Sequence, residues 1–326
     1  MTSYVEHLNA LLRREIGRQQ RFVAFGQNIA AGSCLSGLSR ELPQGPDHLV
    51  LNTPNVENAL TGMGFGLMQR GLAAAFLMKQ LDFLLLGLDQ LANTWNVFRA
   101  QPGPGSFTIL AIVVDGGFAG PQSSFNGLAD MCATAQLSGF TVTNRSDAEV
   151  LLSRQFGAPG FRIIAVSERL FRQPVLVPWA AEPTVYADGG LFRYRQGPAA
   201  TVVCHNFSLP QGLALADGLD HAGLPVSLFS LNAAHPIDHV PLMDDLRRTR
   251  RLLLLDDSKS RFQPYAGLLA DARVCCGPDN VHLFARGPGD LAPNDDRFDV
   301  SPDEVLAMLF AGTALPAATA TAAAGG

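Results

Sequence analysis

The sequence contains few charged residues. Asp, Glu, Lys and Arg make up 16% of its 326 residues, against roughly 25% in a typical soluble domain. Lys79 and Lys259 are the only lysines, and arginine supplies the remaining positive charge. Hydrophobic residues make up 47%, which is ample for a sizeable core. A surface with so little charge indicates that another subunit covers part of it.

Two classes of partner are excluded by what is missing. The net charge is -5, so the chain lacks the basic footprint of a nucleic-acid-binding protein. Residues 1–14 are polar and amphipathic, without the apolar core of a signal peptide. The leucine-rich stretch 72–91 is interrupted by Lys79, Asp82 and Asp89, so it predicts a buried core helix and not a membrane span. We therefore expect neither nucleic acid nor a membrane as a partner.

Motifs for metals, redox chemistry and nucleotides are also missing. The cysteines fit no zinc or redox spacing, which indicates reduced thiols in a cytoplasmic protein. His235 and His239 are four residues apart, but Pro236 lies between them and no third ligand follows, so they do not predict a metal site. Neither a Walker A loop nor Gly-x-Gly-x-x-Gly after a strand occurs. The five cysteines are Cys34, Cys132, Cys204, Cys275 and Cys276.

Alternating strand and helix patterns predict an α/β protein of two domains with mostly parallel sheets flanked by helices. The loop from Asp115 to Ser124 follows a buried strand, and such loops bind ligands in open α/β sheets. In the first domain we expect strands at 21–25, 48–51, 107–114, 140–143 and 161–167, and helices at 4–19, 58–70, 82–100 and from 146. In the second domain we expect strands at 200–205, 226–229 and 251–256, and helices at 210–222 and 238–247.

Glu57 is the main candidate for chemistry. It stands in the segment Thr-Pro-Asn-Val-Glu-Asn, at the start of a helix rich in glycine and apolar residues. Enzymes use an acid in such a setting to protonate or hold the nitrogen of a heterocycle. The alternative is an ordinary first-turn acid that complements the helix dipole.

The segment from Asn52 to Glu57, the glycine-rich helix after it, Phe83, and the pair Asp89-Gln90 together carry a resemblance. The chain resembles the beta subunits of the thiamine diphosphate-dependent 2-oxo acid dehydrogenases and the matching half of transketolase. The spacing matches without a gap, and the resemblance runs to about residue 312. It implies a pyrimidine-binding transketolase-like domain over 1–173, a linker over 174–198 and a transketolase C-terminal-like domain over 199–314. A disordered tail over 315–326 is expected to follow.

The resemblance also implies roles for individual residues. Glu57 would hydrogen-bond the pyrimidine ring of thiamine diphosphate and so help to form the thiazolium carbanion, the catalytic nucleophile. Phe83 would pack on that ring, and Leu81 would belong to the same cofactor-binding set. The alternative for Phe83 is a plain core residue. Asp89 and Gln90 are expected to have structural roles.

The family's Gly-Asp-Gly motif and later Asn-Asn pair, which bind diphosphate and Mg²⁺, are missing. Asp115-Gly116-Gly117 lacks the preceding glycine. The resemblance therefore implies a separate alpha-type subunit that carries the diphosphate and Mg²⁺ ligands. We expect this chain to form a dimer of its own and a two-plus-two heterotetramer with that partner.

One departure from the family bears on the substrate. Ser123 stands where the dehydrogenase beta subunits have the His of a Gln-His-Ser motif, and no His occurs between His48 and His205. A serine hydroxyl carries no charge near pH 7. We therefore expect Gln122 and Ser123 to face a neutral ketose or polyol substrate, unless the partner brings a cation. His205, at the end of the first strand of the second domain, is a further substrate candidate, with a core residue as the alternative.

These features leave three functions open. The first is a transketolase-like transferase that forms carbon–carbon bonds by moving a two-carbon or acyl unit between keto or sugar substrates. The second is the beta subunit of a 2-oxo acid dehydrogenase or decarboxylase. The third is a non-catalytic scaffold that has kept the fold. The sequence does not identify the donor, the acceptor, the pathway, the use of a lipoyl group, the partner chain or the group that replaces the missing His.

Overall fold

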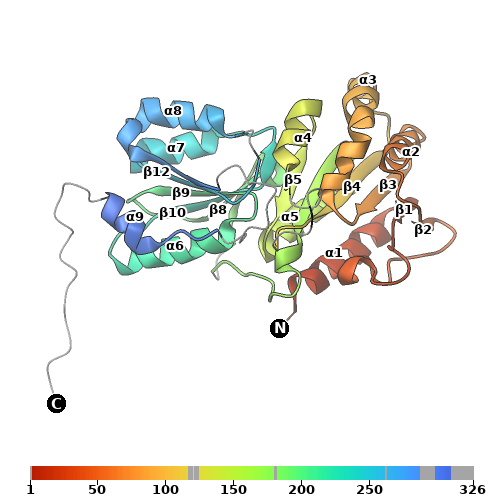
Figure 1. Ribbon diagram of the computed structural model, residues 1–326, viewed down its shortest axis with the longest axis horizontal. Helices are drawn as coiled ribbons and strands as arrows, with labels where there is room; N and C mark the ends of the chain where they lie inside the picture. Colours follow the sequence, from red (N-terminus) through yellow and green to blue (C-terminus); the bar gives the residue numbers. More distant parts are fainter. Residues whose placement is uncertain are drawn as a thin grey trace, which may run out of the picture.

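The computed structural model describes residues 2–116, 120, 125–179, 182–260, 263–286 and 298–309. They form two α/β units that lie side by side (Figure 1). Each unit is built on a mostly parallel sheet with helices on both faces, so the predicted fold class is confirmed. Gln122, Ser123 and the predicted tail 315–326 fall outside the described residues.

The first sheet has seven strands in the order β11-β5-β6-β4-β3-β1-β2. Every neighbouring pair is parallel except β11–β5. The central strands β4 and β6 are buried along their whole length, as expected for a parallel sheet covered on both faces. The strands are β1 (Phe22–Gly26), β2 (His48–Asn52), β3 (Ala73–Met78), β4 (Ser106–Val113), β5 (Gly139–Val142), β6 (Gly160–Ser167) and β11 (Ala233–His235).

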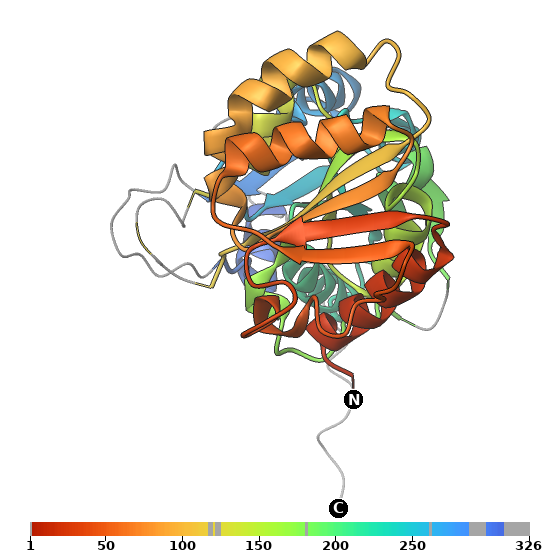
Figure 2. The same ribbon diagram turned by 90° about the vertical axis from the view of Figure 1, so that its right-hand side faces the viewer.

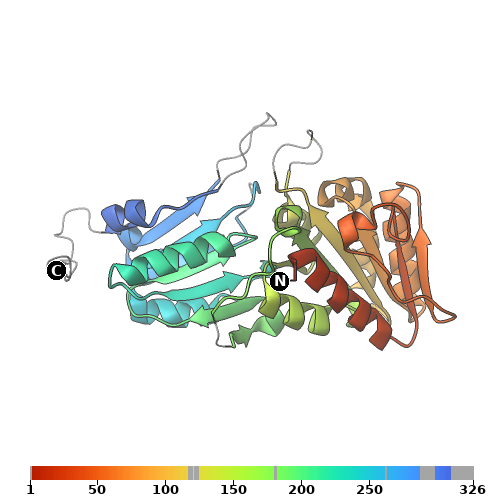
Figure 3. The same ribbon diagram turned by 90° about the horizontal axis from the view of Figure 1, so that it is seen from below.

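Helices cover this sheet on both faces because its strands alternate their side chains. Leu110 points into the core cluster that contains residues of α1 (Tyr4–Arg18) and α5 (Arg145–Gln155). Ile109 points into the cluster on the other face, with α2 (Glu57–Gln69) and α4 (Leu128–Ala135). The short helix α3 (Trp95–Phe98) lies on that second face and contributes Trp95. Figure 3 shows α1 lying across its face of the sheet.

The prediction of a core helix within 72–91 was wrong in its first part. Residues 73–78 form β3, which pairs with β1 on one side and β4 on the other. Alanine and leucine favour a helix locally, but burial between two strands overrides that preference. The predicted helix 82–100 is broken into a 3₁₀ helix (Leu81–Gly87), a π-helical turn (Gln90–Thr94) and α3.

The second sheet has six strands in the order β13-β12-β9-β10-β8-β7. Helices α6 (Leu209–His221) and α9 (Pro302–Leu309) pack on one face, and α7 (Val240–Thr249) and α8 (Ala266–Cys276) pack on the other. Part of the predicted linker 174–198 belongs to this sheet, because β7 and β8 lie within it and β8 pairs antiparallel with β10. The strands are β7 (Thr184–Tyr186), β8 (Leu191–Arg195), β9 (Thr201–His205), β10 (Ser227–Leu231), β12 (Leu252–Asp256) and β13 (Val281–Ala285).

Asn232 joins the two sheets. The chain leaves β10 of the second sheet and enters β11, the edge strand of the first sheet, with only this residue between them. The Asn232 side chain donates hydrogen bonds to the Thr141 carbonyl oxygen and to Asp147 Oδ2, each at 2.7 Å. Burial raises the pKa of Asp147 to about 6. One core cluster continues from α1 into the second sheet, so the two units pack as one body.

Among the helices that the structure describes, none is long and apolar enough to cross a membrane.

Two glycines of α2 provide a matched test of packing between this helix and the sheet. A Cβ atom on Gly64 would lie 2.1 Å from Cζ of the buried Phe107, whereas a Cβ on Gly66 would meet no atom within 4 Å. We expect Gly64→Ala to lower the free energy of unfolding by about 1–3 kcal/mol because it overpacks the core. Gly66→Ala should raise it by about 0.5–1 kcal/mol through helix propensity. Urea unfolding of both variants measures the difference, and equal effects would contradict the packing.

Candidate functional site

The candidate site residues gather at one edge of the first sheet. Because β1, β2, β3, β4 and β6 run parallel, the segments that follow them all leave at the carboxyl edge. Figure 2 views the molecule from the β1 and β2 side, with α2 and α3 above the sheet and α1 below it. Glu57 follows β2 on this edge, and Phe83 follows β3.

Glu57 and Phe83 line the same small pocket. Glu57 is the first residue of α2, and its side chain is 8% exposed. Within the described part of the chain, its carboxylate has no hydrogen bond and no ion pair. The pocket volume is about 20 Å³, which is room for about one water molecule. Its lining residues are Gln27, Asn55, Glu57, Leu60, Phe76, Leu77, Met78, Lys79 and Phe83.

Leu81 lies deeper than these residues. It is 1% exposed and belongs to the buried cluster that also contains Phe25 and Phe65. It is not among the residues that line the pocket. Direct contact between Leu81 and a cofactor stays a prediction.

Lys79 was not among the candidates taken from the sequence. It directly follows β3, is exposed, and lines the pocket with Glu57. Lys79 could be recognised as a candidate only after residues 73–78 were found to form a strand. A residue just after a parallel strand lies at the edge of the sheet where ligands bind. Gln27, directly after β1, also lines the pocket and was not among the candidates, although the strand before it was predicted.

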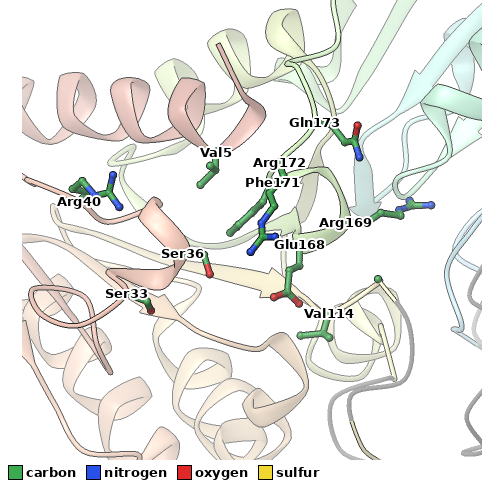
Figure 4. A pocket seen from close by; sticks show the side chains of 11 residues that line it. Val5, Ser33, Ser36, Arg40, Val114, Glu168, Arg169, Phe171, Arg172 and Gln173 are labelled. Atoms are coloured by element: carbon green, nitrogen blue, oxygen red, sulfur yellow. The ribbon is translucent and has the colours of Figure 1, made fainter. Parts of the chain in front are cut away.

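A larger cavity of about 760 Å³ lies on the same edge (Figure 4), within the range of small-molecule sites. Ser33, Ser36 and Arg40 come from the segment between β1 and β2, and Val5 comes from α1. The remaining lining residues follow β4 and β6: Val114, Gly116, Glu168, Arg169, Phe171, Arg172 and Gln173.

The charges of this cavity suit an anion. Arg40 and Arg172 are exposed, and neither forms an ion pair with any residue that the structure describes. Figure 4 shows Arg172 and Glu168 pointing into the cavity, whereas Arg169 points toward the second domain. Guanidinium groups bind carboxylates and phosphates through paired hydrogen bonds.

Arg169 links the two domains beside this cavity. Its Nη2 lies 2.7 Å from Asp257 Oδ2, and its Nε lies 3.5 Å from Asp115 Oδ2. Asp115 also accepts hydrogen bonds from Ser167 Oγ at 2.6 Å and from the Arg169 amide at 3.0 Å. Burial raises the pKa of Asp115 above its usual range, although Arg169 opposes that shift. Asp115 therefore has a structural role at the junction.

His205 is buried in the second domain. It is 3% exposed, and its Nδ1 lies 3.2 Å from Asp256 Oδ1. Asp256 also accepts hydrogen bonds from Tyr265 Oη at 2.8 Å and Ser258 Oγ at 3.0 Å. Burial by itself would raise the pKa of Asp256, but His205 and these donors hold that pKa below its usual value. The setting matches the core residue that the sequence left open, and contact with substrate stays a prediction.

Metal ligands do not come together in the described part of the chain. No group of three or more His, Cys, Asp or Glu side chains in it could hold a metal ion.

The ion pairs of Arg169 with Asp115 and Asp257 predict an effect on the free energy of unfolding that is specific to Arg169. Removing one partner of a buried ion pair costs roughly 3–5 kcal/mol, and the Arg169 side chain is 24% exposed. We expect Arg169→Gln to lower the free energy of unfolding by somewhat less than that range. Arg172→Gln, three residues away and exposed, should change it by no more than about 0.5 kcal/mol. Chemical denaturation compares the two variants, and similar losses would mean that the junction contributes little.

Comparison with known proteins agrees with the resemblance seen in the sequence. No protein-family model matches the chain. It is 22% identical to the 2-oxoisovalerate dehydrogenase subunit beta of Bacillus subtilis, over 94% of this chain and 97% of that protein. It is 24% identical to the pyruvate dehydrogenase E1 component subunit beta of Rhizobium meliloti, over 77% of this chain and 55% of that protein.

A solved structure extends the comparison to the fold. The chain superposes on a structure described as a split gene transketolase, inactive beta4 tetramer, with a TM-score of 0.68. The match covers 87% of this chain and 90% of that one, at 14% sequence identity.

Proposed function

We propose that the chain is the pyrimidine-binding subunit of a two-component enzyme of the thiamine diphosphate-dependent family that includes the transketolases and the 2-oxo acid dehydrogenase beta subunits. Its similarity to proteins of that family supports the proposal. The observation that carries this proposal is that Glu57 and Phe83 lie in the same pocket. The two side chains line one pocket, and the Glu57 carboxylate has no partner among the described residues. Glu57 is 8% exposed, and a ligand that hydrogen-bonds its carboxylate would satisfy a polar group that is largely removed from water.

The pocket fits one edge of a heteroaromatic ring. Glu57 can hold a proton at a ring nitrogen, and Phe83 supplies an aromatic surface for packing, which is worth about 0.5–1.5 kcal/mol beyond burial. Leu60, Phe76 and Met78 supply an apolar wall that excludes water. When bound, thiamine diphosphate supplies the nucleophile, and the protein binds and orients it.

A second chain is needed to complete this site. The pocket has room for about one water molecule, so a ring would lie at its mouth and be covered by another surface. Three apolar side chains close in sequence to Glu57 and Phe83 are exposed: Val56 by 44%, Leu85 by 44% and Leu86 by 56%. We propose that an alpha-type subunit covers them and brings the diphosphate and Mg²⁺ ligands, in a two-plus-two heterotetramer.

Two reactions suit this site. The first is transketolase-like transfer of a two-carbon or acyl unit, which the missing family His favours. The second is oxidative decarboxylation of a 2-oxo acid, which the similarity to a 2-oxoisovalerate dehydrogenase subunit beta over 97% of its length favours. A non-catalytic scaffold is a weaker candidate, because it would not require an acid and an aromatic ring in one pocket.

Assembly gives the first test. We expect the chain to form a dimer alone and a two-plus-two complex when it is co-expressed with an alpha-type chain that contains Gly-Asp-Gly. The dimer alone should bind thiamine diphosphate and Mg²⁺ weakly, because it lacks their ligands, and the complex should bind them tightly. Light scattering and calorimetry measure both properties. Tight binding of the cofactor and metal by a monomer of this chain would rule out the two-component proposal.

Glu57 gives the second test. Glu57→Gln should leave folding and assembly nearly unchanged, since an amide has the same shape. It should slow hydrogen–deuterium exchange at the thiazolium carbon of the bound cofactor by about 10²–10⁴-fold, the usual contribution of a positioned acid or base. Nuclear magnetic resonance of the quenched complex measures this exchange. Glu182→Gln, at an exposed acid, is the control. Exchange at the parent rate in Glu57→Gln would show that Glu57 is not the activating acid.

A further inference from the structure

Lys79 places a positive charge in the Glu57 pocket that the proposed function does not use. The residue stands just after β3, is exposed, and lines the pocket together with Glu57 and Phe83. An acidic and a basic residue therefore line the same small pocket.

The ammonium group of Lys79 has no partner in the part of the chain that the structure describes. Among the described residues it forms neither an ion pair nor a hydrogen bond, and this includes the Glu57 carboxylate in the same pocket. The other basic residues near this edge do not line the Glu57 pocket. Arg40 and Arg172 line the larger cavity instead. Arg169 is held by Asp115 and Asp257. Burial raises the pKa of Asp82, and Lys259 lies close enough to that carboxyl to oppose the shift. Lys79 is thus the cation of this pocket that remains available to a ligand.

The residue type supports a specific role. The 24 basic residues include only two lysines, so arginine is the usual basic residue of this chain. A lysine ammonium is a compact charge with three donors on a flexible stem, whereas the guanidinium of arginine is a broad planar fork. A compact cation suits a narrow pocket beside a carboxylate. Because Glu57 repels anions, an anionic group near it needs a cation close by.

We propose that Lys79 is a specificity-determining residue that binds the anionic group of the substrate beside the ring that the Glu57 pocket holds. The group is the carboxylate of a 2-oxo acid or the phosphate of a sugar phosphate, and both are held by the same ammonium. This inference rests on the proposed function of the pocket. It also replaces the expectation of a neutral substrate, which assumed that this chain brings no cation to the site.

The two lysines allow a direct binding experiment on the full chain. Lysine labelled with ¹³C at the ε carbon gives one signal for Lys79 and one for Lys259, and the spectrum of Lys79→Met assigns them. We expect pyruvate, inorganic phosphate or both to shift the Lys79 signal in a saturable way. Glycolaldehyde, a neutral probe, should not shift it. Equal shifts at both lysines, or no shift at Lys79, would overturn the proposal.

Kinetics of the assembled complex identify the source of the anion. Lys79→Met should raise KM at least tenfold for the anionic substrate, with kcat changed much less, and Lys79→Arg should restore part of the affinity. A rise for pyruvate assigns the carboxylate, and a rise for a ketose phosphate assigns the phosphate. Lys259→Met is the matched control and should leave KM unchanged. An equal loss of kcat for charged and neutral substrates would overturn the proposal.

The two experiments separate failure of this inference from failure of the proposed function. If the complex turns over none of the substrates, the proposed function fails, and the lysine spectra of the chain alone still decide whether Lys79 binds anions. If the complex is active but Lys79→Met behaves like the parent protein, the inference fails and the proposed function stands.

Discussion

Parallel pairing of the strands in the first sheet is the constraint on which the rest of the molecule depends. β1 pairs with β2 and β3, β3 with β4, and β4 with β6, all in the same direction. Every connection after these strands must therefore leave at one edge. The Glu57 pocket, the arginine-lined cavity and the Arg169 junction all lie on that edge because no other arrangement follows from this topology.

The second domain holds this edge in place. Arg169 reaches from the end of β6 to Asp257 beyond β12, and Asn232 reaches back to Asp147 in the first domain. The Asn232 contact is buried and the Arg169 contact is partly buried, so separating either pair would leave a polar group without its partner in a place that water reaches poorly. The shared hydrophobic core and the β11–β5 pairing add to them. The second sheet thus acts as a support that fixes the loops beside the candidate site.

Under the proposed function, the chain provides only part of the catalytic site. It contributes an acid at Glu57, an aromatic face at Phe83 and a cation at Lys79, around a pocket with room for about one water molecule. Exposed apolar side chains close to Glu57 and Phe83 in sequence are a surface that a second chain can cover. The low charge of the sequence agrees with this arrangement, because a surface buried in an assembly needs little charge.

The sequence by itself determined the α/β class, most strands of the first sheet and the three strands β9, β10 and β12 of the second. Its resemblance to a known family singled out Glu57 and Phe83, which line one pocket. Continuous apolar runs and motif spacing are local signals, and burial strengthens them. Tertiary structure alone decided that residues 73–78 form β3, because their alanine-rich pattern also suits a helix and only pairing with β1 and β4 makes them a strand. The place of Lys79 depends on that strand. The ion pair between Arg169 and Asp257 could not be predicted from the sequence either. Asp257 lies 88 residues away along the chain and comes close to Arg169 only when the two sheets pack together.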